Sequence, residues 1–362
     1  MDALPYLIGY LIPAVAAVGL WLGGPYTFLG LAFTFGAIPA LDALGGLDTA
    51  NADVAGEAAR DRNPLFNLIV RLWILPHAGL LVFAGWLALT AGWGPVAWTG
   101  AVLSVGVMSA GVGITIAHEL MHRRGAGDRA LGEALMTLSS YPHFCVEHVY
   151  GHHKTVATPD DPAFAPYGQS LYAFLPKTLI GGVRSAWRHE TRRVARKAGD
   201  RLTWRDRRVR YPLDLLVMYG AVAWLGGPLG VGFFAAQSLV AMVLLELINY
   251  IEHYGLERRR LPSGKYEKVT PHHSWNSAHR VSKHLLFALP RHADHHANAS
   301  RPYWKLRHFD DAPQMPAGYP SMVLLSLAPP LWFRVMNPRV RQWNASVAER
   351  HPAAPAQAPA VA

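Results

Sequence analysis

Three short clusters of histidine carry the clearest chemistry in this chain. They read H-E-L-M-H at 118–122, E-H-V-Y-G-H-H at 147–153 and H-A-D-H-H at 292–296. Residues four apart share one face of a helix, so His118 with His122, and His148 with His152, are each expected to hold one metal ion. His153 lies about 100° round a helix from His152, so it is expected to point towards a second ion.

Nine histidines in all are expected to bind metal, because His253 ends a further apolar segment near these clusters. A transition ion takes about four to six ligands, so this set implies at least two ions. Imidazole suits iron, zinc, copper and nickel, so the spacing alone leaves the metal open. The predicted ligands are His118, His122, His148, His152, His153, His253, His292, His295 and His296.

Carboxylate and amide side chains beside the histidines are expected to orient the rings rather than to bind metal directly, by accepting imidazole N–H bonds. Glu246, Asn249 and His253 lie at i, i+3 and i+7, which is one helix face, and polar groups inside a membrane usually face the bundle interior. Glu246 could instead be a structural hydrogen-bond partner. The predicted supporting residues are Glu119, Glu147, Glu246, Asn249, Glu252 and Asp294.

The other histidines are expected to lie outside the metal centre. Four lie away from the clusters and are predicted to be structural: His77, His189, His308 and His351. Five adjoin the clusters and could be structural or could hydrogen bond to ligands: His143, His272, His273, His279 and His284.

Two other functions share part of this pattern. H-E-x-x-H is the zinc-binding signature of metalloproteases, but a protease needs only one ion and would leave two clusters unused. A metal transporter would also carry histidines in a membrane, but its ligands should lie near the bilayer midplane. Here the histidines lie at the ends of apolar segments and in long loops, which argues against transport.

The composition is that of a membrane protein, because 51% of the 362 residues are hydrophobic and only 16% are charged. About 20 apolar residues cross a bilayer. The predicted fold is therefore an all-α integral membrane protein with six transmembrane helices and a cytoplasmic, histidine-rich di-metal cap. Residues 1–340 are expected to form one membrane-embedded domain and 341–362 a disordered tail. The predicted spans are 6–22, 26–44, 65–89, 96–117, 212–229 and 231–251.

The distribution of charge predicts the orientation. The loops after the first, third and fifth spans contain no Lys or Arg, and nearly all of the 34 basic residues lie in the other loops and the C-terminal segment. The positive-inside rule then places both termini and every histidine cluster in the cytoplasm of a multi-pass protein of the cell (inner) membrane. The net charge of +10 reflects these loops, and no nucleic-acid binding is expected.

One loop stretch, residues 187–210, is strongly basic and includes Arg192, Arg193, Arg196 and Lys197. Such a stretch is typical of a helix that faces solvent or lipid headgroups. Docking of an acidic protein partner is the alternative.

Four segments resemble the signatures of the membrane alkane 1-monooxygenases: H-E-L-M-H-R at 118–123, E-H-V-Y-G-H-H at 147–153, N-Y-I-E-H-Y-G-L at 249–256 and L-P-R-H-A-D-H-H-A at 289–297. H-S-W-N-S at 273–277 is similar too, and the resemblance covers roughly residues 60–340. The third signature is the more specific, since fatty-acid desaturases, sterol-type hydroxylases and xylene monooxygenases share the others more loosely. Pro290 departs from the pattern, because the family usually has Gln there.

The resemblance implies a non-haem di-iron centre with two iron ions, and terminal hydroxylation of medium- to long-chain n-alkanes by O2. It also implies electrons from rubredoxin, itself reduced by an NAD(P)H-dependent rubredoxin reductase. Rubredoxin is expected in trans, because one cysteine, Cys145, cannot build a four-cysteine iron site. The nearest alternative is a fatty-acid desaturase or a hydroxylase of another apolar substrate.

An alkane has no polar group, so it is expected to enter from the bilayer into an apolar channel that ends beneath the metals. Bulky residues of the first four spans are the expected stops of this channel. They are Trp21, Phe28, Phe33, Trp73 and Trp86.

Overall fold

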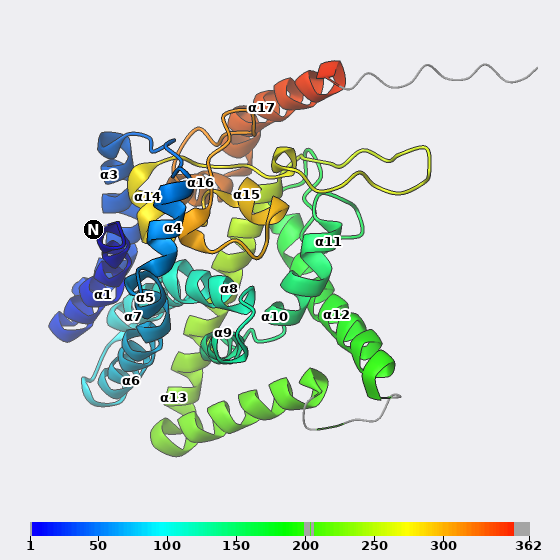
Figure 1. The fold of residues 1–362 in the computed structure, drawn as a ribbon. Coiled ribbons are helices and arrows are strands. Elements are labelled where there is room, and N and C mark those ends of the chain that lie inside the picture. The colour runs from blue at the N-terminus through cyan, green and yellow to red at the C-terminus, as the bar shows by residue number, and fades with distance from the viewer. Residues whose placement is uncertain (1, 199–202, 204–205, 351–362) are drawn as a thin grey trace, which may run out of the picture.

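The computed structural model describes residues 2–198, 203 and 206–350, and within them the chain is helical (Figure 1). The described residues form no β-strand, only three isolated β-bridges. This confirms the predicted all-α class. The part of the predicted tail from 351 onwards, with His351, lies outside the described residues.

Five helical stretches are long and apolar enough to cross a membrane, and they cover the predicted spans: Leu4–Leu22, Gly24–Gly45, Leu65–Thr90, Pro95–Met121 and Arg207–His253. Several change helix type along their length. The first joins η1 (Leu4–Tyr10) to α1 (Leu11–Leu22), and the third joins α5 (Leu65–Leu72) to α6 (Ile74–Thr90). The second consists of η2 (Gly24–Phe28), α2 (Leu29–Ala32), η3 (Phe33–Ala37) and α3 (Ile38–Gly45), and the fourth of α7 (Pro95–Met108), η4 (Ser109–Ile114) and α8 (Thr115–Met121).

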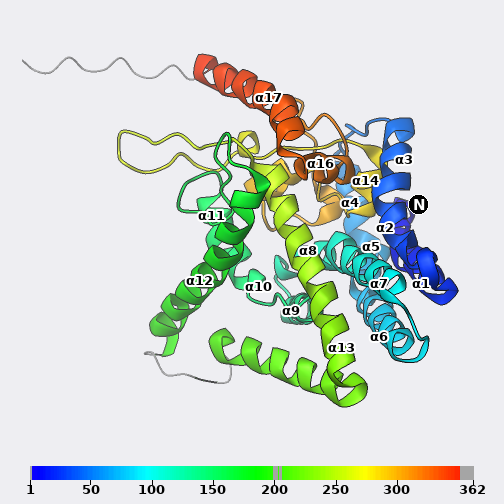
Figure 2. The ribbon, with the colours of Figure 1, turned by 180° about the vertical axis from the view of Figure 1, so that it is seen from behind.

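The fifth stretch, α13 (Arg207–His253), contains both of the last two predicted spans. Gly227 interrupts its helical backbone with φ 56° and ψ −156°, a conformation that glycine adopts readily because it has no Cβ. Pro228 follows and cannot continue the hydrogen-bond ladder. The two arms of α13 therefore meet at the corner visible in Figures 1 and 2.

The fourth stretch is the central helix, because 83% of its most apolar window is buried, against 22–44% in the other four. Glycines allow its neighbours to approach closely. A Cβ on Gly106 would lie 2.5 Å from Val240 of α13, and one on Gly113 would lie 2.5 Å from the ring of His77. This packing fixes the position of the first histidine cluster, which lies at the end of α8.

The remaining elements surround that helix end (Figures 1 and 2). On one side lie α9 (Ala126–Leu138), α10 (Phe144–Val146), η5 (Glu147–His152), α11 (His153–Thr155) and the long α12 (Leu171–Ala198). On the other lie α4 (Val54–Arg62), η6 (Pro271–His273), α14 (Arg280–Leu285), α15 (His292–Ala297), η7 (Tyr303–Lys305), α16 (Tyr319–Ser326) and α17 (Pro329–Arg350).

A buried carboxylate joins the N-terminal helices to this cap. Asp42 of α3 is 2% exposed and accepts hydrogen bonds from the backbone N–H and the hydroxyl of Ser282 in α14. A buried carboxylate without such donors would be strongly destabilising. The contact therefore specifies how α14, and the loop that leads to α15, sit on the membrane helices.

Candidate metal centre

The nine predicted ligands come together in two groups whose ligand atoms lie within 4.8 Å of one another. The first group, called site A below, consists of His118, His122, His148, His153 and His295. The second, called site B, consists of His152, His253, His292 and His296. Among the described residues, these two sets contain the predicted ligands and no other histidine.

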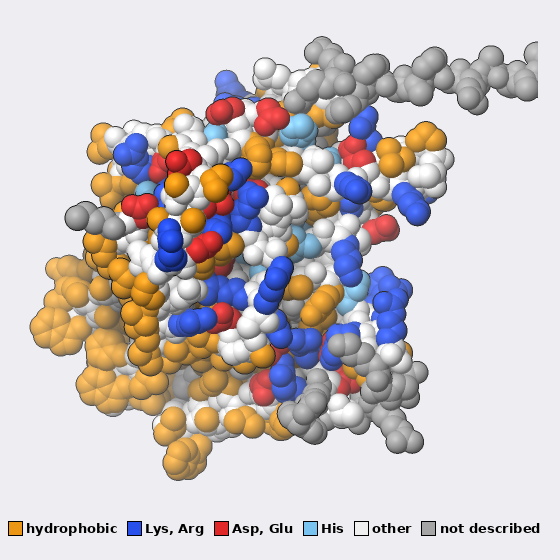
Figure 3. All heavy atoms as spheres, viewed as in Figure 1, with side chains coloured by type: hydrophobic (Ala, Val, Ile, Leu, Met, Phe, Trp, Pro, Cys, Tyr) orange, Lys and Arg blue, Asp and Glu red, His pale blue; other side chains and the backbone are white. Residues whose placement is uncertain are grey.

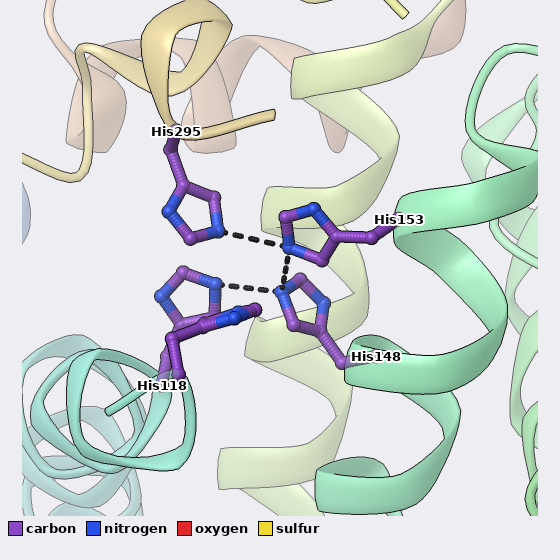
Figure 4. Close-up of side chains that lie close together, drawn as sticks. His118, His148, His153 and His295 are labelled. Carbon is purple, nitrogen blue, oxygen red and sulfur yellow. Dashed lines mark hydrogen bonds between the residues drawn. The ribbon is translucent and has the colours of Figure 1, made fainter. Parts of the chain in front are cut away.

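Site A is built by four elements whose rings point towards one another (Figure 4). The Nε2 atoms of His118 and His148 are 2.7 Å apart, and those of His148 and His153 are 3.0 Å apart. Nε2 of His295 lies 3.0 Å from Nε2 of His153. His122, at the C-terminal cap of α8, completes the group one helical turn after His118.

Site B joins the end of α13 to α15 and to the second cluster. Nε2 of His292 lies 2.9 Å from Nε2 of His296 and 3.3 Å from Nε2 of His253. His292 and His296 are four residues apart on α15, so they share a face. His295, one position earlier than His296, faces site A instead.

The second cluster is paired differently from the prediction. His148 lies with His153 in site A, and His152 lies in site B, so the expected pairing of His148 with His152 is wrong. The reason is local, because η5 is a π-helix, whose wider turn brings residues five apart into line. The expectation that His152 and His153 diverge is confirmed, and His295 and His296 diverge in the same way.

The ring nitrogens are better placed to bind a metal cation than to hydrogen bond to one another. Buried polar atoms normally have partners, yet Nε2 of His122 and Nε2 of His152 have none. Burial lowers the pKa of His122 to about 3, and burial followed by the neighbouring rings lowers the pKa values of His148 and His295 well below the usual value. Neutral imidazoles with converging lone pairs are the donor set that a transition ion requires.

A carboxylate that the sequence analysis missed orients one ring of site B. Oδ2 of Asp161 lies 2.8 Å from Nδ1 of His152, and both side chains are almost fully buried. Although burial opposes protonation, Asp161 raises the pKa of His152 to about 9. A hydrogen bond at Nδ1 leaves Nε2 facing the site, as in carboxylate–histidine–metal arrangements. Asp161 lies in a loop, so no helical spacing relates it to His152.

Glu252 lies among the ligand nitrogens themselves. Its Oε2 is 3.1 Å from Nε2 of His292, and its Oε1 accepts a hydrogen bond of 2.8 Å from the hydroxyl of Tyr319. Tyr319 was not identified from the sequence. It holds Glu252 at the boundary between site B and the membrane helices.

Two other predicted carboxylates contact arginine and the backbone. Asp294 accepts hydrogen bonds from Arg301 and from the backbone N–H of Arg307. Glu119 accepts from Arg123 and from the backbone N–H of Tyr303. These contacts hold residues 301–307 against α8 and α15, the helices that carry the first and third histidine clusters.

Glu147, Glu246 and Asn249 line a small cavity that also touches His152. Glu246 accepts hydrogen bonds from Tyr141, Thr178 and Asn249, whereas Oε1 of Glu147 is buried without a partner. Burial, followed by the field of Asp161, raises the pKa of Glu147 to about 8. Glu147 therefore carries a proton near neutral pH.

The comparisons with known proteins agree with this arrangement. The fatty acid desaturase family model matches residues 91–326. The chain is 42% identical over 353 residues to alkane 1-monooxygenase 2 of Pseudomonas aeruginosa, a match that covers 93% of both proteins. The chain belongs to the alkane 1-monooxygenase family. It is also 43% identical over 313 residues to alkane 1-monooxygenase 1 of the same organism, covering 86% of this chain and 82% of that protein.

Family membership confirms the resemblance described above. The histidine clusters alone were ambiguous because related monooxygenases of other substrates are similar to this chain as well. The xylene/toluene monooxygenase hydroxylase component of Pseudomonas putida is 32% identical over 356 residues, covering 95% of this chain and 90% of that protein. The relatives named here are thus monooxygenases, and neither proteases nor transporters.

In this alkane 1-monooxygenase family member, the other described histidines have partners of their own. His77 lies 3.2 Å from Ser109, and His273 contacts Glu267 and the backbone of Thr270. The remaining ones stack, bond or pack elsewhere: His143 on Tyr141, His272 to Asp311, His279 to Ser277, His284 to the backbone of Arg280, His308 to Asp310, and His189 beside Gly151.

An apolar cavity of the monooxygenase runs from the membrane helices to both metal sites. Ile12, Phe35 and Gly111 line it among the helices, and His118 and His292 line it where it meets site A and site B. None of the five aromatic residues predicted as stops lines it. Trp21 and Trp86 are 71% and 56% exposed on the membrane helices, whereas Trp73 is buried beside Tyr10. Residue size could not reveal which helix face points inwards.

Proposed function

We propose that this protein is a membrane monooxygenase that hydroxylates the terminal carbon of medium- to long-chain n-alkanes to 1-alkanols. The apolar cavity carries this proposal, because it is lined by rings of both site A and site B. A linear alkane can be selected only by the length and width of an apolar channel. This cavity opens among membrane helices, where such a substrate dissolves.

The metals we propose are two iron ions, one held by the five histidines of site A and one by the four of site B. The alkane 1-monooxygenase family and the all-imidazole donor set support iron. When bound, the irons would supply the activation of O2 that no side chain of the chain can perform. The nine histidines would be the ligands.

The side chains of the chain then position the reaction and limit access of water. Apolar residues around the cavity exclude water from the alkane, and Tyr319 and Glu252 lie where the cavity meets site B. We propose that Glu119, Glu246, Asn249 and Asp294, with Asp161, support the ligands through the hydrogen bonds described above, and that Glu147 does so from its position in the cavity beside His152.

The reaction converts R–CH3, O2, two electrons and two protons into R–CH2OH and H2O. We propose rubredoxin as the electron donor, reduced by an NAD(P)H-dependent rubredoxin reductase. Family membership supports this donor, and the single cysteine within these 362 residues cannot build a four-cysteine iron site.

We further propose one membrane-embedded domain over residues 1–340, with six spans in the cell inner membrane. The two arms of α13 count as two of these spans. The basic loops support a cytoplasmic position for both termini and the metal centre.

The test is an assay of the protein in lipid nanodiscs with iron, rubredoxin, its reductase, NADH and each n-alkane from octane to hexadecane. We expect 1-alkanols that contain ¹⁸O when ¹⁸O2 is supplied, and two irons per chain by elemental analysis. An unsaturated product that carries no added oxygen, formed from a fatty acyl substrate, would identify a desaturase instead. Absence of iron, or of any oxidised alkane, contradicts the proposal.

A further inference from the structure

A row of arginines runs along one exposed face of α12. Arg184, Arg188, Arg192 and Arg196 follow one another at intervals of four residues, and all four are exposed. This spacing places them on one helix face over a length of about 18 Å. We call these four residues the arginine row.

The positive charge of the arginine row is uncompensated in the part of the chain that the structure describes. The ion pairs of this region are formed by other arginines, with Arg193 bound to Glu190 and with Arg207 and Arg210 bound to Glu133. Arg193 therefore contributes little to the charge that a partner would meet. The basic stretch predicted from the sequence included Arg193 and Lys197; the side chain of Lys197 lies outside the described part, and the described exposed arginines of α12 follow the four-residue spacing.

The arginine row lies beside the element that carries the second histidine cluster. α12 packs on η5 through Ser185 and His189, and a Cβ on Gly151 would lie 3.2 Å from both Oγ of Ser185 and Nε2 of His189. Ser185 directly follows Arg184 in the sequence, and His189 directly follows Arg188. The row is thus held against the cluster that supplies ligands to both sites.

Lys154 extends the positive surface to the metal centre, because it is exposed and directly follows His153 of site A. After burial, the fields of Lys154, Arg192 and Arg188 lower the pKa of His189, so these cations surround one point of the surface. His153 and His122 are half-buried, whereas the other seven ligands are buried. Site A is therefore closer to solvent than site B, and one of its two half-buried ligands adjoins Lys154.

We propose that the arginine row, together with Lys154, is the docking surface for an acidic electron-carrier protein that reduces the centre at the His153 edge of site A. This inference rests on the proposed function, which needs two electrons in each turnover, and it names where they enter. Guanidinium groups bind carboxylates in bidentate geometry, and complementary charge accelerates encounter. Electron transfer slows steeply with distance, so a partner seated beside a half-buried ligand is well placed.

Anionic lipid headgroups could also bind a basic helix. The position of the row favours a protein partner. In Figure 3, hydrophobic side chains cover the region of α1 and α6, whereas Lys and Arg gather over α12 on the other side of the molecule.

The experiment compares wild type with Arg188→Glu/Arg192→Glu in nanodiscs, using rubredoxin as the probe. We expect the Kd of rubredoxin for the metal-free protein, and the KM for reduced rubredoxin in alkane turnover, both to rise about tenfold or more at low salt and to lose their salt dependence. Metal content, and product formed in one turnover with dithionite as the reductant, should stay at wild-type levels. Arg188→Gln/Arg192→Gln should give an intermediate effect.

The matched control is Lys265→Glu/Lys268→Glu, which reverses two exposed charges on the loop after α13 and should leave the rubredoxin Kd unchanged. The docking surface is wrong if the arginine variant binds rubredoxin as wild type does, or if the control variant loses binding equally. It is also wrong if Kd changes only between nanodiscs of phosphatidylcholine and of phosphatidylglycerol, which would indicate a headgroup site. A wild-type protein that makes no alkanol with any reductant would contradict the proposed function, and the Kd measurement would still test the docking surface.

Discussion

Asp161 and His152 form a buried pair in which a loop carboxylate holds the Nδ1 side of a ring whose Nε2 faces site B. Asp161 also accepts a hydrogen bond from the backbone N–H of Ala163, so its own position is defined by the loop. His152 belongs to site B, and the next residue in the chain, His153, belongs to site A. The pair that holds His152 in place is therefore directly linked to a ligand of the other site.

Asp161→Asn should weaken metal binding at site B by about 10- to 100-fold, because a neutral amide oxygen accepts the Nδ1–H bond more weakly than a charged carboxylate does. Titration of the purified protein with a competing chelator measures this. Asp160→Asn changes an exposed neighbour and should bind metal as wild type does. Equal affinities in the two variants would remove Asp161 from the centre.

Substitution within the second cluster should separate the two sites. His153→Ala and His148→Ala should both lower metal occupancy at site A, whereas His152→Ala should lower occupancy at site B. Mössbauer spectra of ⁵⁷Fe-loaded protein distinguish the irons, and we expect the first two variants to lose the same component.

His272→Ala is the control for these variants, because His272 pairs with Asp311 away from both sites. It should keep both iron components and most of the hydroxylation activity. If His148→Ala and His152→Ala instead lost the same component, the assignment of ligands to sites would be wrong.

Gly111→Leu should shorten the preferred alkane. Gly111 lines the apolar cavity, and a Cβ there would meet nothing within 4 Å, so the new side chain can extend into the cavity. Each methylene that can no longer be buried costs about 0.8 kcal/mol, roughly fourfold in kcat/KM. Product profiles from octane to hexadecane measure the shift.

The control for this variant is Gly79→Leu, at an exposed position of α6 that also has open space around it. It should leave the chain-length profile as it is in wild type, and both variants should keep their iron. An unchanged profile in Gly111→Leu would show that the substrate does not pass this point.

The metal-free protein should become less stable as the pH falls from 7 to 5. Burial lowers the pKa of His122 to about 3, and the pKa values of His148, His153, His292, His295 and His296 are lowered too, so these rings stay neutral in the folded state. In the unfolded state they take up protons near pH 6.5, and the state that binds more protons is favoured by acid.

The raised pKa values of Glu147, about 8, and His152, about 9, act in the opposite direction, as two groups against six. Thermal unfolding in detergent at pH 5, 6 and 7 tests the net effect, with iron removed by chelation. His122→Ala should show a shallower dependence on pH than wild type. A midpoint that does not change over this range would contradict the assignment of neutral rings.

Much of the centre could be predicted from the sequence because its information is local. The spacing of the histidines within each cluster identified eight of the nine members of sites A and B, and His253 was identified from its place at the end of an apolar segment. Stretches of apolar residues identified the membrane helices. Both signals depend only on helix geometry and on the cost of placing polar groups in lipid. They do not depend on where distant parts of the chain meet.

The division of the ligands between the two sites was decided by the three-dimensional structure. Helical spacing of four predicted that His148 and His152 would share an ion, but the π-helical turn of η5 aligns His148 with His153. Asp161 and Tyr319 meet their partners through loop and interhelix contacts, and packing decided that Phe35 and Gly111, rather than the five predicted aromatic residues, line the cavity. These outcomes depend on which helix faces are buried against each other, and that is a property of the packed bundle rather than of any single segment.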